Sequence, residues 1–109
     1  MISWEDFEKL KIHVGTILEV HDFPGLHKPA YKLLMDFGPL GKLKSSAQIT
    51  VIYSKEELIN KQVIAVVNFP PKQIANFMSE CLVLGIYGPG NEIVLLQAER
   101  PVDNGSRIG

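Results

Sequence analysis

The segment Lys42–Ile49 carries polar groups at alternating positions. Lys42, Lys44, Ser46 and Gln48 are each two residues apart, and in an extended strand this spacing places all four on one face. Two ammonium groups beside a hydroxyl and an amide can hold a phosphate backbone and contact the base edges of unpaired RNA. The alternative interpretation is an ordinary solvated strand face.

A second candidate site is the segment "NFPPKQIANFMSE", residues 68–80. Two adjacent prolines fix the backbone and remove two hydrogen-bond donors, so we expect a stiff loop. Five side chains make this loop apolar: Phe69, Pro71, Ile74, Phe77 and Met78. One interpretation is a groove for apolar peptide segments, because methionine and phenylalanine adapt to varied partners. The other is that most of them cover the open end of a barrel.

Catalytic chemistry finds little support in the sequence. No phosphate-binding loop, nucleophile elbow or zinc-protease motif is present. Cys81 begins an apolar run, which is typical of a small buried side chain and not of a reactive thiolate. One cysteine and three scattered histidines lack the paired spacing of a metal site. We therefore expect no enzymatic activity, no metal and no cofactor.

Length and composition indicate one globular domain over residues 1–109, with 46% hydrophobic and 21% charged residues. The net charge of −1 argues against gripping nucleic acid through bulk positive charge, so any RNA binding must come from local patches. The single cysteine fits a reducing, cytoplasmic location. The acidic start lacks the pattern of a signal peptide, and no apolar run is long enough to span a membrane.

Local patterns predict mostly β-structure with two short helices. A serine precedes each expected helix and an acidic residue follows it three positions later, over residues 3–10 and 54–60. Alternating or apolar runs predict strands over residues 12–20, 31–37, 42–49, 62–69, 81–87 and 92–97. Short strands with glycine-rich turns suggest a small closed or partly open barrel. A small sandwich is the alternative.

Four stretches together resemble the tRNA-binding domain family found at the ends of methionyl-tRNA synthetases and in free-standing proteins. They are "DFEKLKIHVGTILEV", "KPAYKLLMDFG", "ELINKQVIAVVNFPPKQIANFMSECLVL" and "PVDNGSRIG". The resemblance implies an all-β protein with short helices: a five-stranded oligonucleotide/oligosaccharide-binding (OB) barrel with an N-terminal helix and additional C-terminal strands. It also implies a homodimer that binds tRNA by shape. By position, Asn68, Lys72, Ser79 and Glu80 fall on the family's RNA-facing motif, and Lys32 and Lys44 on its basic strands.

Two segments depart from the synthetase pattern. Ser45–Gln48 stands where Ser-Gly is usual, and Ser79–Leu82 stands where Ser-Glu-Gly-Met is usual. Both segments are more similar to the CsaA-type, export-related chaperones of the family. The resemblance therefore implies a chaperone that binds unfolded or precursor polypeptides, with tRNA binding as a further capacity. The alternative is a free-standing tRNA-binding module that acts in trans for a synthetase.

A homodimer would also cover apolar groups that a small barrel leaves exposed. The candidates for this interface lie at the two ends of the chain: Trp4, Phe7, Leu10, Val102 and Ile108. Two-fold symmetry would duplicate the 68–80 segment and raise the avidity for one extended client. We expect that client to be apolar and basic.

Overall fold

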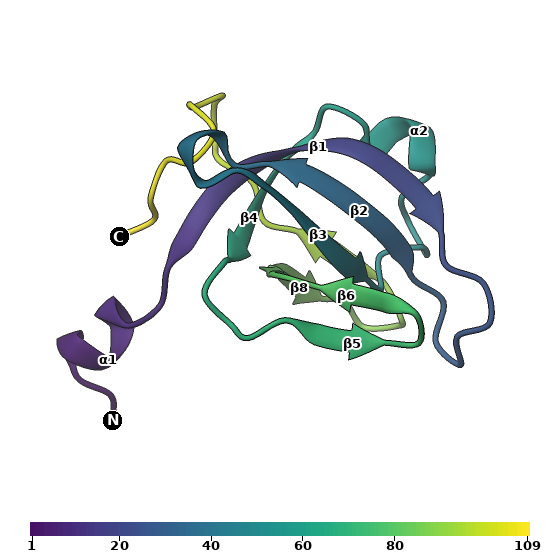
Figure 1. Ribbon diagram of the computed structural model, residues 1–109, viewed down its shortest axis with the longest axis horizontal. Helices are drawn as coiled ribbons and strands as arrows, with labels where there is room; N and C mark the ends of the chain where they lie inside the picture. The colour runs from purple at the N-terminus through teal and green to yellow at the C-terminus, as the bar shows by residue number, and fades with distance from the viewer.

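Five antiparallel strands make one curved sheet in the computed structural model, which describes all residues from Met1 to Gly109. The strand order is β3-β2-β1-β4-β7, and Figure 1 labels the first four of these strands. The bounds are β1 Ile12–Asp22, β2 Tyr31–Asp36, β3 Lys42–Ala47, β4 Gln62–Val66 and β7 Leu82–Val83. The sheet curls so that its edge strands β3 and β7 come into contact in a nearly closed barrel, so the predicted barrel is confirmed and the sandwich is excluded.

Side-chain oxygens help to close this barrel along β3. The Glu80 N–H donates to the Lys44 carbonyl at 2.8 Å, and the Lys44 N–H donates to Glu80 Oε1, also at 2.8 Å. Further along, the Ser46 N–H donates to Ser79 Oγ at 3.1 Å. These bonds satisfy edge donors that would otherwise remain unpaired.

Strand β1 bends in the middle and pairs with a different strand along each half. Its first part, Ile12–Thr16, pairs with β4, and its second part, Thr16–Asp22, pairs with β2. The register with β2 shifts between Ile17 and Glu19, which is the signature of a β-bulge. A bulge bends the strand and increases its twist, and this lets a small sheet close on itself.

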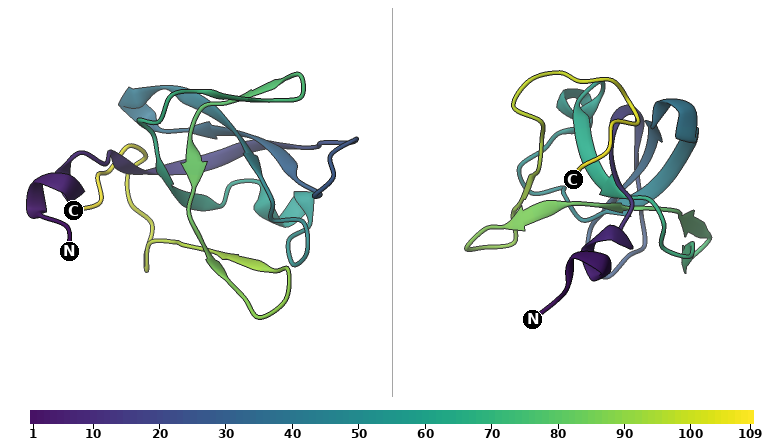
Figure 2. Two further views of the ribbon diagram at one scale, coloured as in Figure 1. Left: turned by 90° about the horizontal axis from the view of Figure 1, so that it is seen from below. Right: turned by 90° about the vertical axis from the view of Figure 1, so that its left-hand side faces the viewer.

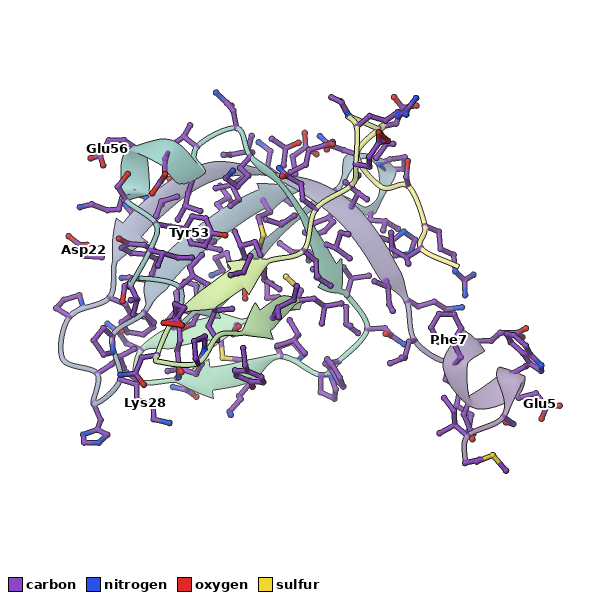
Figure 3. All side chains as sticks on the ribbon, turned by 180° about the vertical axis from the view of Figure 1, so that it is seen from behind. Glu5, Phe7, Asp22, Lys28, Tyr53 and Glu56 are labelled. Atoms are coloured by element: carbon purple, nitrogen blue, oxygen red, sulfur yellow. The ribbon has the colours of Figure 1, made fainter.

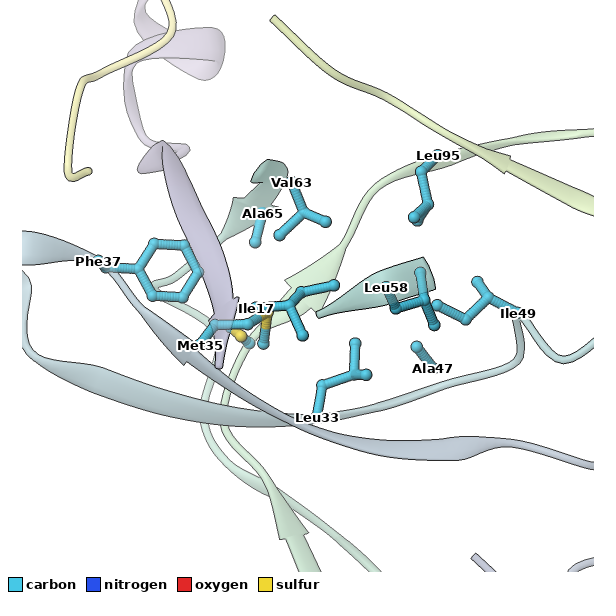
Figure 4. Close-up of a cluster of buried hydrophobic side chains, with 11 residues drawn as sticks. Ile17, Leu33, Met35, Phe37, Ala47, Ile49, Leu58, Val63, Ala65 and Leu95 are labelled. Carbon is cyan, nitrogen blue, oxygen red and sulfur yellow. The ribbon is translucent and has the colours of Figure 1, made fainter. Parts of the chain in front are cut away.

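The core lies inside the barrel and includes Phe37, Ile17, Leu33 and Met35, all fully buried (Figure 4). Helix α2 (Lys55–Leu58) contributes Leu58 to this cluster. Its start is fixed by the predicted capping box, in which Ser54 and Glu57 bond each other's backbone N–H. A short 3₁₀ turn, η1 (Gly38–Leu40), joins β2 to β3.

Two hairpins extend from the barrel, β5 (Lys72–Ile74) with β6 (Phe77–Ser79) and β8 (Gly85–Tyr87) with β9 (Ile93–Leu95). The first hairpin corrects the expected loop over residues 68–80. Its tip places Ala75 at a φ of 52°, a conformation that usually calls for glycine, and the turn Ala75–Asn76 lacks the glycine that marks a two-residue hairpin in a sequence. The apolar run 81–87 also divides, because β7 joins the barrel and only β8 enters the predicted hairpin.

Both ends of the chain are attached to the first part of β1. Helix α1 (Trp4–Glu8) begins at the predicted Ser3–Asp6 capping box and lies to one side of the barrel with Phe7 (Figure 3). The C-terminal segment runs along β1, with the Ile108 N–H donating to the Ile12 carbonyl at 2.8 Å. None of the helices has the length and apolar character needed to cross a membrane.

Candidate functional site

A groove of about 810 Å³ lies between the two hairpins. The left view of Figure 2 shows both hairpins and the residue 79–84 segment that joins them. The apolar lining includes Phe69, Ile74, Leu82, Leu84, Tyr87 and Ile93. The polar lining consists of Ser46, Gln48, Lys72, Ser79 and Glu80. This volume lies within the usual range of ligand pockets, and the lining is mostly apolar with a few polar groups.

Several apolar side chains of the groove face solvent. Phe69 and Leu82 are each 49% exposed, and Tyr87 is 88% exposed. Residues of this kind and size are usually buried in a monomer, and a contiguous set of exposed ones marks a binding surface.

The β8–β9 wall of the groove is fixed to the barrel through Tyr53 (Figure 3). The Leu95 N–H of β9 donates to the Tyr53 hydroxyl at 3.0 Å, and the Tyr31 hydroxyl of β2 donates to the Tyr53 carbonyl at 2.8 Å. The hairpin is therefore connected to β2 through Tyr53.

Beside the groove lies a cluster of two lysines and two phenylalanines, which we term the basic cluster: Phe23, Lys32, Lys44 and Phe77. The rings of Phe23 and Phe77 meet edge to face with centroids 5.5 Å apart. Lys32 Nζ lies 5.2 Å from the Phe23 centroid and 5.9 Å from that of Phe77, while Lys44 Nζ lies 5.4 Å from Phe77. Cation–π contacts of this geometry hold both ammonium groups on one surface.

The five residues expected to bind peptide divide between these places. Phe69 and Ile74 line the groove, whereas Pro71 does not, its neighbour Pro70 lining it instead. Phe77 packs in the basic cluster and is half-buried, and Met78 is exposed on the hairpin outside the groove. The structure thus brings only two of the five together.

The polar face predicted on β3 is present. Lys42, Lys44 and Gln48 are exposed and Ser46 is half-buried, in alternation with the buried Ser45 and Ala47. Ser46 and Gln48 line the groove and Lys44 belongs to the basic cluster, while Lys42 lies in neither. Lys72 lines the opposite wall of the groove.

Three other residues expected to face RNA use their side chains within the protein. Ser79 and Glu80 accept hydrogen bonds from the backbone of β3, as described above. Asn68 Oδ1 accepts from the Lys11 N–H at 2.9 Å, and Asn68 Nδ2 donates to the Lys9 carbonyl at 2.8 Å. Asn68 therefore ties the segment between α1 and β1 to the end of β4.

Cys81 is a buried thiol at the base of the groove. Burial, with a further contribution from the Glu80 charge, raises its pKa to about 12, and the hydrogen bond with Ser45 opposes this shift. A thiol with such a pKa remains protonated at neutral pH and is a poor nucleophile. No group of three or more histidine, cysteine or carboxylate side chains is arranged to hold a metal ion.

Sequence reasoning missed Phe23 and Tyr87. Phe23 follows β1 directly before a Pro-Gly turn and is only 6% exposed, so it anchors the basic cluster from a loop. Tyr87 ends an apolar run before "GPG" and is strongly exposed. An aromatic residue beside a turn is the one signal that both share.

The family model described as putative tRNA binding domain matches residues 12–107. In curated sequences, the methionine–tRNA ligase of Nanoarchaeum equitans is 34% identical over 108 residues, covering 99% of this chain and 14% of that protein. The chain therefore spans about one seventh of the length of such relatives.

Solved structures agree over the whole chain. The chaperone CsaA of Bacillus anthracis is 46% identical with a TM-score of 0.95, covering 100% of this chain and 99% of that one. The CsaA chaperone protein of Picrophilus torridus is 55% identical with a TM-score of 0.94, covering 100% of both chains. These likenesses confirm the expected OB-type barrel.

Proposed function

This chain belongs to the tRNA-binding domain family, and from that premise we propose that it is a homodimeric, export-related chaperone. It holds apolar segments of unfolded or precursor polypeptides in the groove between the two hairpins, in the cytoplasm and without ATP. The exposed apolar lining of the groove, with Phe69, Leu82 and Tyr87 open to solvent, is the observation that carries this proposal. Similarity to CsaA chaperones over the whole chain supports it.

Dimer formation is part of the same proposal. Trp4 is 85% exposed and Val102 is 39% exposed, and Leu10 also reaches solvent. Phe7 and Ile108 are half-buried, with the Ile108 backbone bonded to β1. Covering one such large side chain contributes roughly 1.5–3 kcal/mol, so a few at a two-fold interface suffice to stabilise a dimer.

Suppression of client aggregation tests the chaperone function. We expect the protein to keep a thermally unfolding client soluble, and Phe69→Ala to weaken this effect. Ile52→Ala is a matched control, because Ile52 is exposed to a similar extent, 46%, but lies outside the groove. An equal effect of both variants, or no suppression by the wild type, contradicts the proposal. Light scattering at several concentrations measures the oligomeric state.

A second candidate function, binding of tRNA, is favoured by the basic cluster. Lys32 and Lys44 are held side by side on Phe77, and Lys72 lies on the neighbouring hairpin. The curated relatives are methionine–tRNA ligases and the matching family is one of tRNA-binding domains. The same surface would serve a free-standing module acting in trans for a synthetase.

Salt-dependent gel shifts test this second function. Each phosphate contact lowers affinity by about 0.7–0.9 log units per log unit of salt. We expect Lys32→Ala and Lys44→Ala each to reduce that slope. Lys9→Ala should leave it unchanged, because this exposed lysine pairs with Asp6 and lies in neither the groove nor the basic cluster. Absence of binding to total tRNA at low salt contradicts tRNA binding and leaves the chaperone function standing.

A further inference from the structure

The outer edge of β8 is an unpaired strand edge that lines the groove. Strand β8 pairs with β9 and with no other strand. Backbone bonds from Leu96 to Leu84 and from Gly88 to Glu92 fix the alternation of the hairpin. In an antiparallel pair, the residues between bonded positions direct their N–H and C=O groups outward. Gly85 and Tyr87 occupy those positions and line the groove.

These four backbone groups have no partner within the chain. No hydrogen bond joins the N–H or C=O of Gly85 or Tyr87 to any loop, turn or side chain. The outer edge of β9, the partner strand in the same hairpin, differs, because its Leu95 N–H donates to the Tyr53 hydroxyl. The β8 edge therefore offers all four of its outward groups, and both of its residues are exposed, whereas Ile93 is half-buried and Leu95 is buried on the β9 edge.

An extended polypeptide is the ligand that satisfies such an edge. A strand added along β8 would exchange two bonds with Gly85 and two with Tyr87, at peptide positions two residues apart. Side chains at those two positions point to the same face as Tyr87 and its partner Ile93, which is the face that lines the groove. The aliphatic lining then selects apolar residues at alternate positions.

The charges around the groove favour an acidic client residue in place of the basic one expected from the sequence. Lys72 lines the wall opposite β8, and Lys32 and Lys44 lie on the adjoining basic cluster. The carboxylate that lines the groove, Glu80, already accepts a bond from the Lys44 N–H. The lining itself carries one charge of each sign, and the two lysines of the basic cluster make its surroundings positive, so a client carboxylate placed toward Lys72 is the complementary group.

We propose that the groove binds client polypeptide as an added β-strand along the free edge of β8, with apolar side chains at alternate positions on the groove lining and an acidic side chain toward Lys72. The inference rests on the proposed chaperone function and defines how the client is recognised. It differs from hydrophobic capture alone because it requires the client backbone.

A fluorescent octapeptide with alternating apolar residues and one terminal aspartate tests the proposal by anisotropy and by amide exchange. We expect bound peptide to protect the Gly85 and Tyr87 amides, which are unbonded in the free protein. N-methylation of a peptide amide in register with β8 should weaken binding roughly 2- to 10-fold, the equivalent of one hydrogen bond. N-methylation one residue away should have little effect.

Two variants of Tyr87 separate the contribution of its backbone N–H from that of its side chain. Tyr87→Pro removes the edge N–H without removing a bond to β9, and Tyr87→Ala keeps that N–H. We expect the proline variant to bind the peptide more weakly than the alanine variant. Replacing the aspartate of the peptide with lysine should weaken binding to wild type but not to Lys72→Ala. If Tyr87→Pro fails to fold, the N-methyl series on the wild type decides.

The outcomes distinguish strand addition from the proposed chaperone function on which it rests. If aggregation is suppressed and peptide binds while N-methylation is tolerated and the two amides stay unprotected, strand addition is overturned and the chaperone function survives. If neither peptide binding nor suppression occurs, both are overturned. Protection of the same amides by an RNA oligonucleotide only, or by raising the protein concentration alone, overturns the proposal in favour of RNA or of a second copy of the chain.

Discussion

Glu80 bonds both backbone groups of Lys44, donating its N–H to the Lys44 carbonyl and accepting the Lys44 N–H at its side-chain oxygen. One residue thus satisfies the edge of β3 where the barrel closes. We expect Glu80→Ala to lower the free energy of unfolding by about 1–3 kcal/mol, because the Lys44 N–H loses its acceptor. Glu80→Gln keeps an acceptor oxygen and should cost less. Urea denaturation measures both, and equal losses would contradict a hydrogen-bonding role.

Gly15 is expected to tolerate no side chain. A Cβ there would lie 2.6 Å from Cε1 of Phe37, whose ring is fully buried and cannot move aside. Gly15→Ala should therefore destabilise the fold by about 1–3 kcal/mol, the usual cost of overpacking a core. Gly109→Ala is the control, since nothing lies within 4 Å of a Cβ at that position. A neutral Gly15→Ala in thermal denaturation would contradict this packing.

The raised pKa of Cys81, about 12 against an ordinary value of 9.0, predicts a pH dependence of stability. Between these values the folded protein retains a proton that the unfolded chain releases. The stabilisation from this group is thus complete below about pH 9 and is lost as the pH rises toward 12, by about 1.4 kcal/mol per pH unit.

Cys81→Ala isolates this contribution, because the two proteins differ in this side chain alone. Wild type should lose stability more steeply than Cys81→Ala above pH 9, and parallel curves would contradict the shift. At pH 8, a thiol reagent should modify Cys81 only after denaturant is added.

We expect Asn68 to hold the N-terminal segment in place and to contribute little to the stability of the barrel. Asn68→Ala removes the bonds to both Lys9 and Lys11, which releases α1 from the end of β4. If α1 belongs to the dimer interface, this variant should raise the dimer dissociation constant and speed proteolysis before Ile12, with a small change in barrel stability.

Asn68→Asp serves as the graded comparison, because a carboxylate still accepts from the Lys11 N–H but cannot donate to the Lys9 carbonyl. Light scattering and limited proteolysis provide the readouts. A dimer as tight as wild type with an accelerated N-terminal cleavage would remove α1 from the interface.

The barrel follows from the sequence because its signals are local. The pattern over residues 12–20 and the capping boxes at Ser3 and Ser54 each depend on neighbours a few positions apart, and the structure contains the strand and both boxes. The strict alternation fails at the β-bulge, where Ile17 enters the core in place of its neighbours. The hairpin at residues 72–79 could not be predicted in this way, since Ala75 occupies a turn position without a glycine signal.

The groove was predicted only in part for a different reason. Its walls come from segments that are distant in the sequence, such as Ser46 and Tyr87, and no local pattern indicates their approach. The resemblance drew attention to Asn68, Ser79 and Glu80, yet the structure gives these side chains backbone partners. Side chains that support a site and side chains that contact a ligand can occupy the same motif.

The attachment of β9 to Tyr53, and of Tyr53 to β2, has a kinetic consequence. A cavity whose wall is fastened before any partner arrives needs no opening step, so little conformational entropy is lost on encounter. We therefore expect fast association, and we expect partners of different affinity to differ mainly in their dissociation rates.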